Sequence, residues 1–175
     1  MSDIFLHHYD ASPFTQRVLK MLAIKDLAWQ SVIQPMIMPK DALIALTGGY
    51  RGTPVMQIGA DIYIDSQCIA EELENRFPDA TLFPNGNRGM PLALAFWGDA
   101  FFEAGMHMAV HELFDQWGET FRQDRAKLFS AMDFDRAKRD FPDACARLRA
   151  NASLVEAQLY DGRAFLQGPK PGMAD

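Results

Sequence analysis

The chain has 175 residues, 49% of them hydrophobic and 23% charged, which is enough for a globular protein to fold without disulfides or metals. Its formal charge of −6 argues against a general nucleic-acid binder, which would carry a basic stripe. The start of the chain is acidic and no apolar run reaches about 18 residues, so we predict no signal peptide, no membrane span and a cytoplasmic location.

The first part of the chain predicts secondary structure in the order βαβα–ββα. Hydrophobic periodicity, β-branched residues and capping or turn residues at the element ends carry this prediction. In chain order the predicted elements are a strand at 4–8, a helix from 12, a strand at 29–33, a helix at 41–46, strands at 54–58 and 61–64, and a helix at 66–76. Ser12 and Ser66 are the predicted N-caps of their helices, with Pro13 at a first helical position.

The remainder of the chain predicts helices only. Residues 78–91 are rich in proline, asparagine and glycine, which is typical of a linker. Helical patterns follow at 91–117 and 141–160, with charged helical segments within 124–140. We therefore predict a mixed α/β domain at 1–80, a linker at 81–90 and an all-α domain at 91–175.

Ser12 stands at a predicted helix start, where unpaired N–H groups and a partial positive charge favour an anion. The pKa of a free thiol is roughly 8.5, and such a place lowers it to about 3.5–7.5. The Ser12 hydroxyl is therefore suited to donate a hydrogen bond to a substrate thiolate. An isolated Ser-Pro pair is better explained as a helix cap.

Two more residue pairs mark open backbone groups at element ends. Thr53-Pro54 opens a strand, and a proline there removes a ladder donor and often follows a cis bond. Asp65-Ser66 begins a helix whose free N–H groups suit a carboxylate. Each pair taken alone is better explained by a trans edge proline or by simple capping.

Together, in this order and spacing, the three pairs resemble the glutathione-binding domain of soluble glutathione transferases. The signature similar to their serine-type motif is Tyr9-x-x-Ser12-Pro13-Phe14-x-x-Arg17-Val18. The resemblance covers residues 3–90. It implies a thioredoxin-like N-terminal domain with a mixed sheet, followed by an all-α domain.

The resemblance also implies roles for these residues. In this family the serine orients the glutathione sulfur, so Ser12 is the predicted catalytic residue, with Tyr9 as the alternative because other classes use a tyrosine near the end of the first strand. Thr53, where valine is more common, would pair through its backbone with the cysteinyl unit beside Pro54.

Asp65 and Ser66 would hold the γ-glutamyl end of the bound peptide, again on the resemblance. The helix start and Ser66 would take its carboxylate, and Asp65 would lie near its ammonium group. The family more often has glutamate or glutamine in place of Asp65, and aspartate keeps the charge with a shorter reach.

The function implied is that of a glutathione transferase, which joins the glutathione thiolate to a small hydrophobic electrophile. Glutathione would be the co-substrate, no metal would be needed, and the protein would form a homodimer. One alternative is a non-catalytic glutathione-transferase-like binding or interaction protein. A glutathione-dependent thiol transferase is a weaker alternative, because position 12 is not a cysteine.

The end of the chain also resembles this family. Phe165-Leu166-x-Gly168 and then Gly172-Met173-Ala174-Asp175 are similar to the start of a core helix of its α domain, with Asp175 as the capping acid and Gly172 replacing a serine or threonine. A full transferase would continue through several more helices. The resemblance therefore predicts that the helical domain is truncated.

The resemblance also predicts an electrophile pocket formed by Phe14, Phe102 and Met106, because the family places the electrophile against the long helix. Ordinary core packing of these side chains is the simpler explanation. His107 and His111 are spaced i,i+4, but without an HExxH pattern they do not predict a metal site. Cys68 is expected to be an inert, buried thiol.

Overall fold

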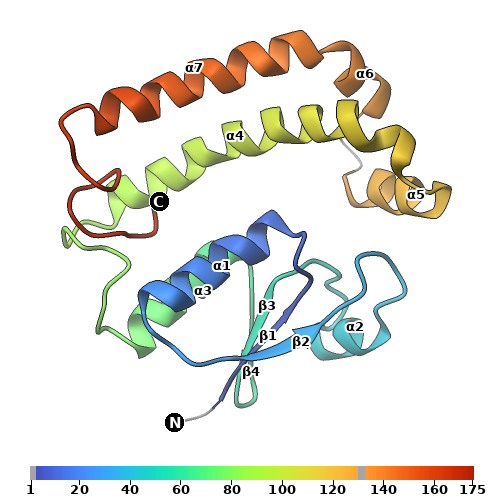
Figure 1. Ribbon diagram of the computed structural model, residues 1–175. Coiled ribbons are helices and arrows are strands. Elements are labelled where there is room, and N and C mark those ends of the chain that lie inside the picture. The colour runs from blue at the N-terminus through green and yellow to red at the C-terminus, as the bar shows by residue number, and fades with distance from the viewer. Residues whose placement is uncertain (1–2, 130–132) are drawn as a thin grey trace. The chain divides into compact units, whose positions relative to one another are not determined.

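The computed structural model describes residues 3–129 and 133–175, which fall into two compact units. The first unit runs to Gly86 and includes Pro171–Met173; the second comprises Asn87–Lys170 with Ala174–Asp175. The first unit is mixed α/β and the second is helical (Figure 1). The predicted fold class is therefore confirmed.

A four-stranded sheet in the order β2-β1-β3-β4 organises the first unit. Its strands are β1 (Ile4–His8), β2 (Gln30–Ile33), β3 (Val55–Ile58) and β4 (Asp61–Ile64). Strand β2 is parallel to β1, whereas the β1–β3 and β3–β4 pairs are antiparallel. The sheet is mixed, as the sequence predicted.

The helices of this unit are α1 (Pro13–Ile24), α2 (Asp41–Thr47) and α3 (Ser66–Arg76). Helices α1 and α3 contact each other and lie together against the sheet (Figure 1). Fully buried side chains from the sheet and these two helices form the core, among them Leu6, Val18, Leu22, Val55, Met56, Ile69 and Leu73. Their hydrophobic burial stabilises the arrangement.

Two glycines end elements where the sequence predicted an end. Gly48 follows α2 with φ of 69°, a left-handed conformation that glycine adopts without steric penalty. Gly59 has φ of 63° in the β3–β4 hairpin, where Ile58 pairs with Asp61. The short hairpin is therefore confirmed.

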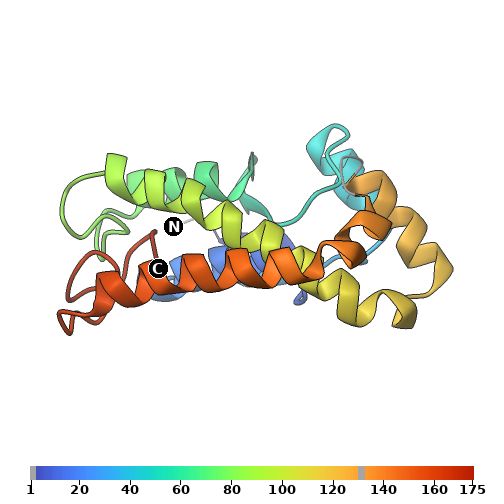
Figure 2. The same cartoon turned by 90° about the horizontal axis from the view of Figure 1, so that it is seen from above.

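The second unit contains α4 (Gly89–Leu113), a 3₁₀ turn η1 (Phe114–Gln116), α5 (Glu119–Leu128), α6 (Phe134–Arg139) and α7 (Phe141–Leu159). Figure 2 shows α4 and α7 side by side. They run antiparallel, because Trp97 donates a 2.8 Å hydrogen bond to Asn151 while His111 stacks on Phe141. The part of the predicted segment 124–140 at residues 130–132 lies outside the described residues.

A buried ion pair connects α1 and α3 to the segment that follows α3. The Lys25 ammonium, just after α1, lies 2.7 Å from the Glu74 carboxylate on α3 and donates to the Phe77 carbonyl at 2.6 Å. Glu74 also accepts hydrogen bonds from the Leu82 N–H at 2.9 Å and from the Thr81 hydroxyl. These four contacts fix the exit from α3.

Residues 171–173 return to this same segment. The Met173 N–H donates to the Leu82 carbonyl at 2.8 Å, and a Cβ on Gly172 would lie only 2.8 Å from that oxygen. Glycine at position 172 is therefore required by this close backbone approach. In the second unit the Asp175 carboxylate accepts the Leu166 N–H at 2.7 Å, and its role as a capping acid stays a prediction.

None of the helices among the described residues is both long and apolar enough to cross a bilayer. Within residues 3–129 and 133–175, no group of three or more histidine, cysteine, aspartate or glutamate side chains is placed to hold a metal ion.

Candidate functional site

The open element ends identified in the sequence meet at one edge of the sheet. His7 of β1 pairs with Val55 of β3, and Val55 pairs with Ile64 of β4. Because both pairs are antiparallel, the start of β3 lies beside the ends of β1 and β4. Ser12, Thr53-Pro54 and Asp65 stand just outside these three strand ends, so the register gathers them.

Ser12 is the N-cap of α1, as predicted. Its backbone is extended (φ −80°, ψ 118°), and its Oγ accepts the Thr15 N–H at 3.2 Å. The hydroxyl also donates a long hydrogen bond of 3.5 Å to the Thr53 carbonyl, and the residue is only 2% exposed. A contact of this length is weak, so a better acceptor would take the proton readily.

The bond between Thr53 and Pro54 is cis, so the trans edge proline that would explain this pair taken alone is ruled out. Pro54 is buried at the start of β3, and Thr53 is half-buried. Thr53 is thus the residue that joins the β3 edge to Ser12.

At the start of α3 the structure corrects the sequence prediction. Asp65, not Ser66, is the N-cap: one carboxylate oxygen accepts the N–H groups of Gln67 at 2.8 Å and Cys68 at 3.3 Å. Asp65 has φ of 74°, a region that aspartate tolerates better than most residues. A carboxylate also interacts favourably with the positive end of the helix, so it is the stronger cap of the two.

Ser66 is the first residue of α3 and is buried. Its Oγ accepts a 3.1 Å hydrogen bond from Nη1 of Arg17 on α1, whose guanidinium also lies 5.7 Å from the Phe14 ring centroid. Arg17 therefore joins the two helix starts. No role of Arg17 was predicted from the sequence, where its place in the signature was the only signal for it.

The alternative hydroxyl, Tyr9, has a half-buried ring with the Lys40 ammonium 5.3 Å from its centroid. Lys40 is only 4% exposed and donates to the Arg51 carbonyl at 3.3 Å. A buried cation next to Tyr9 was missed at the sequence level, because a lysine before a short helix is typical of an exposed position.

Tyr50 lies close enough to Asp65 for the two side chains to interact electrostatically. Partial burial, together with the negative charge of Asp65, raises the pKa of the Tyr50 phenol. Any side chain at position 52 would overlap the Tyr50 ring, so Gly52 allows the ring to fold back over the backbone. The phenol stays protonated and can donate a hydrogen bond at neutral pH.

Cys68 is exposed on α3, so the prediction of a buried thiol was wrong. The buried face of this helix carries Ile69, Ala70 and Leu73 instead. Partial desolvation, followed by the charge of Asp65, raises the pKa of the Cys68 thiol. The thiol is therefore protonated and weakly nucleophilic at neutral pH.

The three residues of the predicted electrophile pocket are divided between the units. Phe14 belongs to the first unit, whereas Phe102 and Met106 lie on α4 of the second, and all three are half-buried. Phe102 has the Phe129 ring 6.5 Å away, centroid to centroid. That these residues share one pocket stays a prediction.

The cap at Asp65 leads to a stability prediction. We expect Asp65→Ala to lower the free energy of unfolding by about 1 kcal/mol, because two N–H groups of α3 lose their acceptor. Asp65→Asn keeps an acceptor at the same place and should stay within about 0.5 kcal/mol of the wild type. Urea denaturation measures both, and equal losses in the two variants would show that Asp65 does not act as a cap.

Comparison with known proteins agrees with the fold. The family described as glutathione S-transferase, N-terminal domain, matches residues 6–81. A GST-like protein from Pseudomonas syringae is 37% identical, with a TM-score of 0.67, over 100% of this chain and 55% of that one. The chain thus spans about half the length of that relative.

Two solved structures of lower identity share the fold. A glutathione S-transferase from Rhodospirillum rubrum is 21% identical with a TM-score of 0.69, over 98% of this chain and 72% of that one. Rice GST1, solved in complex with glutathione, is 21% identical with a TM-score of 0.68, over 99% of this chain and 71% of that one. No curated protein matches the chain.

Proposed function

We propose, from the premise that this chain belongs to the glutathione transferase family, that it binds glutathione and transfers its thiolate to a small electrophile. The observation that carries the proposal is the meeting of Ser12, Thr53 and the start of α3 at one sheet edge. These elements offer a hydroxyl, a strand-like backbone edge and a helix N-terminus, which match the thiol, peptide and carboxylate groups of the tripeptide.

Ser12 would hold the sulfur. Its hydroxyl makes only a 3.5 Å hydrogen bond to Thr53, so its proton can turn to a thiolate placed at the start of α1. The N-terminal end of the helix dipole adds a partial positive charge there. Both effects favour the thiolate over the thiol, and the thiolate is the nucleophile.

The γ-glutamyl end would lie at the start of α3. Its carboxylate would meet the Ser66 hydroxyl, with Arg17 adding a positive charge 3.1 Å from that oxygen. One Asp65 oxygen is used by the cap, so the other would accept the γ-glutamyl ammonium. The correction of the N-cap therefore keeps Asp65 and Ser66 in the proposed site.

Assembly and location are also part of the proposal. A homodimer in the cytoplasm is expected from the family resemblance, without nucleic-acid or membrane partners. Light scattering of the purified protein tests the dimer, since a single mass equal to one chain would refute it.

The binding part of the proposal is tested by titration of glutathione in a calorimeter. Asp65→Asn removes the charge that would meet the ammonium while keeping the cap, so the affinity should fall about fivefold, as for an exposed ion pair. The unfolding midpoint should not change, because Asn caps as well as Asp. A wild-type protein that does not retain glutathione would overturn the proposed function.

Conjugation is tested separately with a panel of aryl halides, enones and epoxides. Glutathione binding together with conjugation supports the transferase. Binding without conjugation of any member would favour the non-catalytic binding protein instead.

A further inference from the structure

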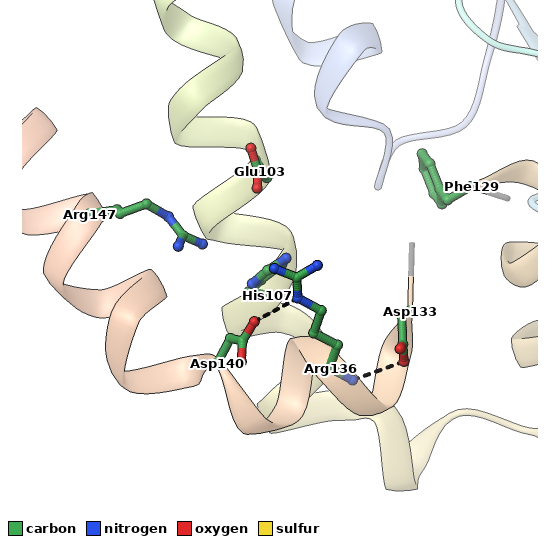
Figure 3. A pocket seen from close by; sticks show the side chains of 7 residues that line it. All are labelled: Glu103, His107, Phe129, Asp133, Arg136, Asp140 and Arg147. Carbon is green, nitrogen blue, oxygen red and sulfur yellow. Dashed lines mark hydrogen bonds and ion pairs between the residues drawn. The ribbon is translucent and has the colours of Figure 1, made fainter. Parts of the chain in front are cut away.

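The second unit contains a pocket of about 400 Å³, lined by side chains from α4, α6 and α7 and by Phe129 (Figure 3). Its volume falls within the range of small-molecule sites, about 300 to 1,000 Å³. Within the described part of the chain, the lining combines charged side chains of both signs with the rings of His107 and Phe129. A ligand can pair only with those charges that have no partner within the protein.

Two of the carboxylates in the pocket already have partners. The Asp133 carboxylate caps α6 by accepting the Arg136 N–H at 2.9 Å, and the Asp140 carboxylate accepts from Arg136 Nε at 3.0 Å. Figure 3 shows both contacts as dashed lines. Arg136 therefore pairs with Asp140, whereas Asp133 is held by a backbone N–H, and this wall carries one net negative charge.

Three other polar side chains have no such partner. Among the described residues, the Arg147 guanidinium on α7 and the Glu103 carboxylate on α4 make no ion pair or hydrogen bond, with each other or with any other group. Nδ1 of His107 is buried and lacks a hydrogen-bond partner. A free cation, a free anion and a free ring nitrogen thus line one pocket (Figure 3).

An apolar wall completes the pocket. The Phe129 ring stands across from His107 (Figure 3). The Phe102 ring on α4 is 6.5 Å from the Phe129 ring, centroid to centroid. A ligand that buries an apolar group against these rings gains affinity, because its apolar surface is removed from water.

We propose that this pocket binds a small zwitterion, an α-amino acid with an aromatic or aliphatic side chain. Its carboxylate lies at Arg147 and His107, its ammonium at Glu103, and its side chain against Phe129. A simple anion would be repelled by Glu103 and a simple cation by Arg147, whereas a zwitterion uses both charges. The site does not depend on the proposed glutathione chemistry.

The test uses three probes of one shape, L-phenylalanine, 3-phenylpropionate and 2-phenylethylamine, titrated against the full chain without glutathione. The NMR signals of the His107 ring report binding at this place. Because Glu103 and Arg147 are exposed, each charge contact should be worth about fivefold in affinity. Phenylalanine should therefore bind about fivefold more tightly than either probe that lacks one charge.

Variants assign each charge to its residue. In Arg147→Gln, phenylalanine should bind no more tightly than 2-phenylethylamine, which lacks the carboxylate. In Glu103→Gln, phenylalanine should bind no more tightly than 3-phenylpropionate, which lacks the ammonium group. Arg149→Gln is the matched control, since Arg149 is exposed on the same helix but does not line the pocket, and it should leave all three affinities unchanged.

Several results would overturn the proposal. One is equal affinity for the three probes, and another is the absence of any change in the His107 signals. A third is that 3-phenylpropionate binds more tightly than phenylalanine and that Glu103→Gln does not alter its affinity. Since conjugation is not measured, a failure here leaves the proposed transferase function untouched.

Discussion

Replacing Glu74 by glutamine is expected to lower the free energy of unfolding by about 3 kcal/mol, because removal of one partner from a buried ion pair leaves an uncompensated charge. The Lys25 side chain is 0% exposed and the Glu74 side chain 9%, so water cannot replace the lost carboxylate. With an uncharged amide at position 74, the Lys25 ammonium would have only neutral acceptors, among them the Phe77 carbonyl. Chemical denaturation at neutral pH measures the loss.

Two comparisons separate this burial effect from a general loss of charge. Arg76→Gln breaks exposed contacts with Asp61 and Glu72 and should cost at most about 1 kcal/mol. The double variant Lys25→Met with Glu74→Leu removes both charges and should recover much of the stability lost in Glu74→Gln. If Glu74→Gln cost no more than Arg76→Gln, the pair would not be a significant contributor.

The same pair sets a dependence on pH. Burial by itself raises the pKa of Glu74, but hydrogen bonds from Lys25, Thr81 and the Leu82 N–H outweigh it and hold the pKa below its usual value of 4.5. The stabilisation is therefore complete above that usual value and is lost as the pH falls through the lower, folded value. The stability difference between wild type and Glu74→Gln should be constant near neutral pH and shrink in acid.

Local signals were sufficient for most of the first unit. Strand β1 spans residues 4–8 as predicted, and α3 ends at Arg76, because apolar periodicity and breaker residues agree there. The meeting of Ser12 with Thr53 could also be predicted, since the βαβ–ββα order places their strand ends at one edge once the pairing is known.

The errors come from choices that only the tertiary structure makes. Asp65 and Ser66 are both good N-cap residues, and the cap is the one that stands just outside the helical backbone. Asp65, with φ of 74°, lies outside it, and the helix begins at Ser66. Cys68 directly precedes the buried residues Ile69 and Ala70 in the sequence. Because neighbouring helix positions are 100° apart around the helix axis, its own side chain nevertheless faces the solvent.

Buried charges are the other features that the sequence did not reveal. Lys25 and Lys40 are 5% and 4% exposed, although lysine is usually a surface residue. Their partners lie far away along the chain or are backbone carbonyls, so no spacing rule marks them. The pocket formed by α4, α6 and α7 could not be predicted for the same reason: its lining residues come from separate helices that are distant along the chain.

Replacing Ser12 by alanine is expected to lower kcat for conjugation by about tenfold to a hundredfold while glutathione affinity changes little. The reason is that one hydrogen bond to a charged acceptor contributes about 1.5 to 3 kcal/mol, here to the thiolate alone. The thiol form of glutathione would still be bound through the Thr53 edge and the start of α3. The rise of the rate with pH should also move to higher pH, because the bound thiol becomes a weaker acid.

Since Ser12 also caps α1, the loss of the cap must be separated from the loss of the hydroxyl. Ser12→Ala removes the acceptor of the Thr15 N–H and should cost about 1 kcal/mol, whereas glycine at an N-cap costs only a few tenths. Ser12→Gly should therefore be the more stable variant but equally slow, and its pH profile should move by the same amount. If kcat instead fell only as much as the stability of each variant fell, Ser12 would have a purely structural role. If Tyr9→Phe were slow while Ser12→Gly kept full activity, the thiolate contact would belong to Tyr9.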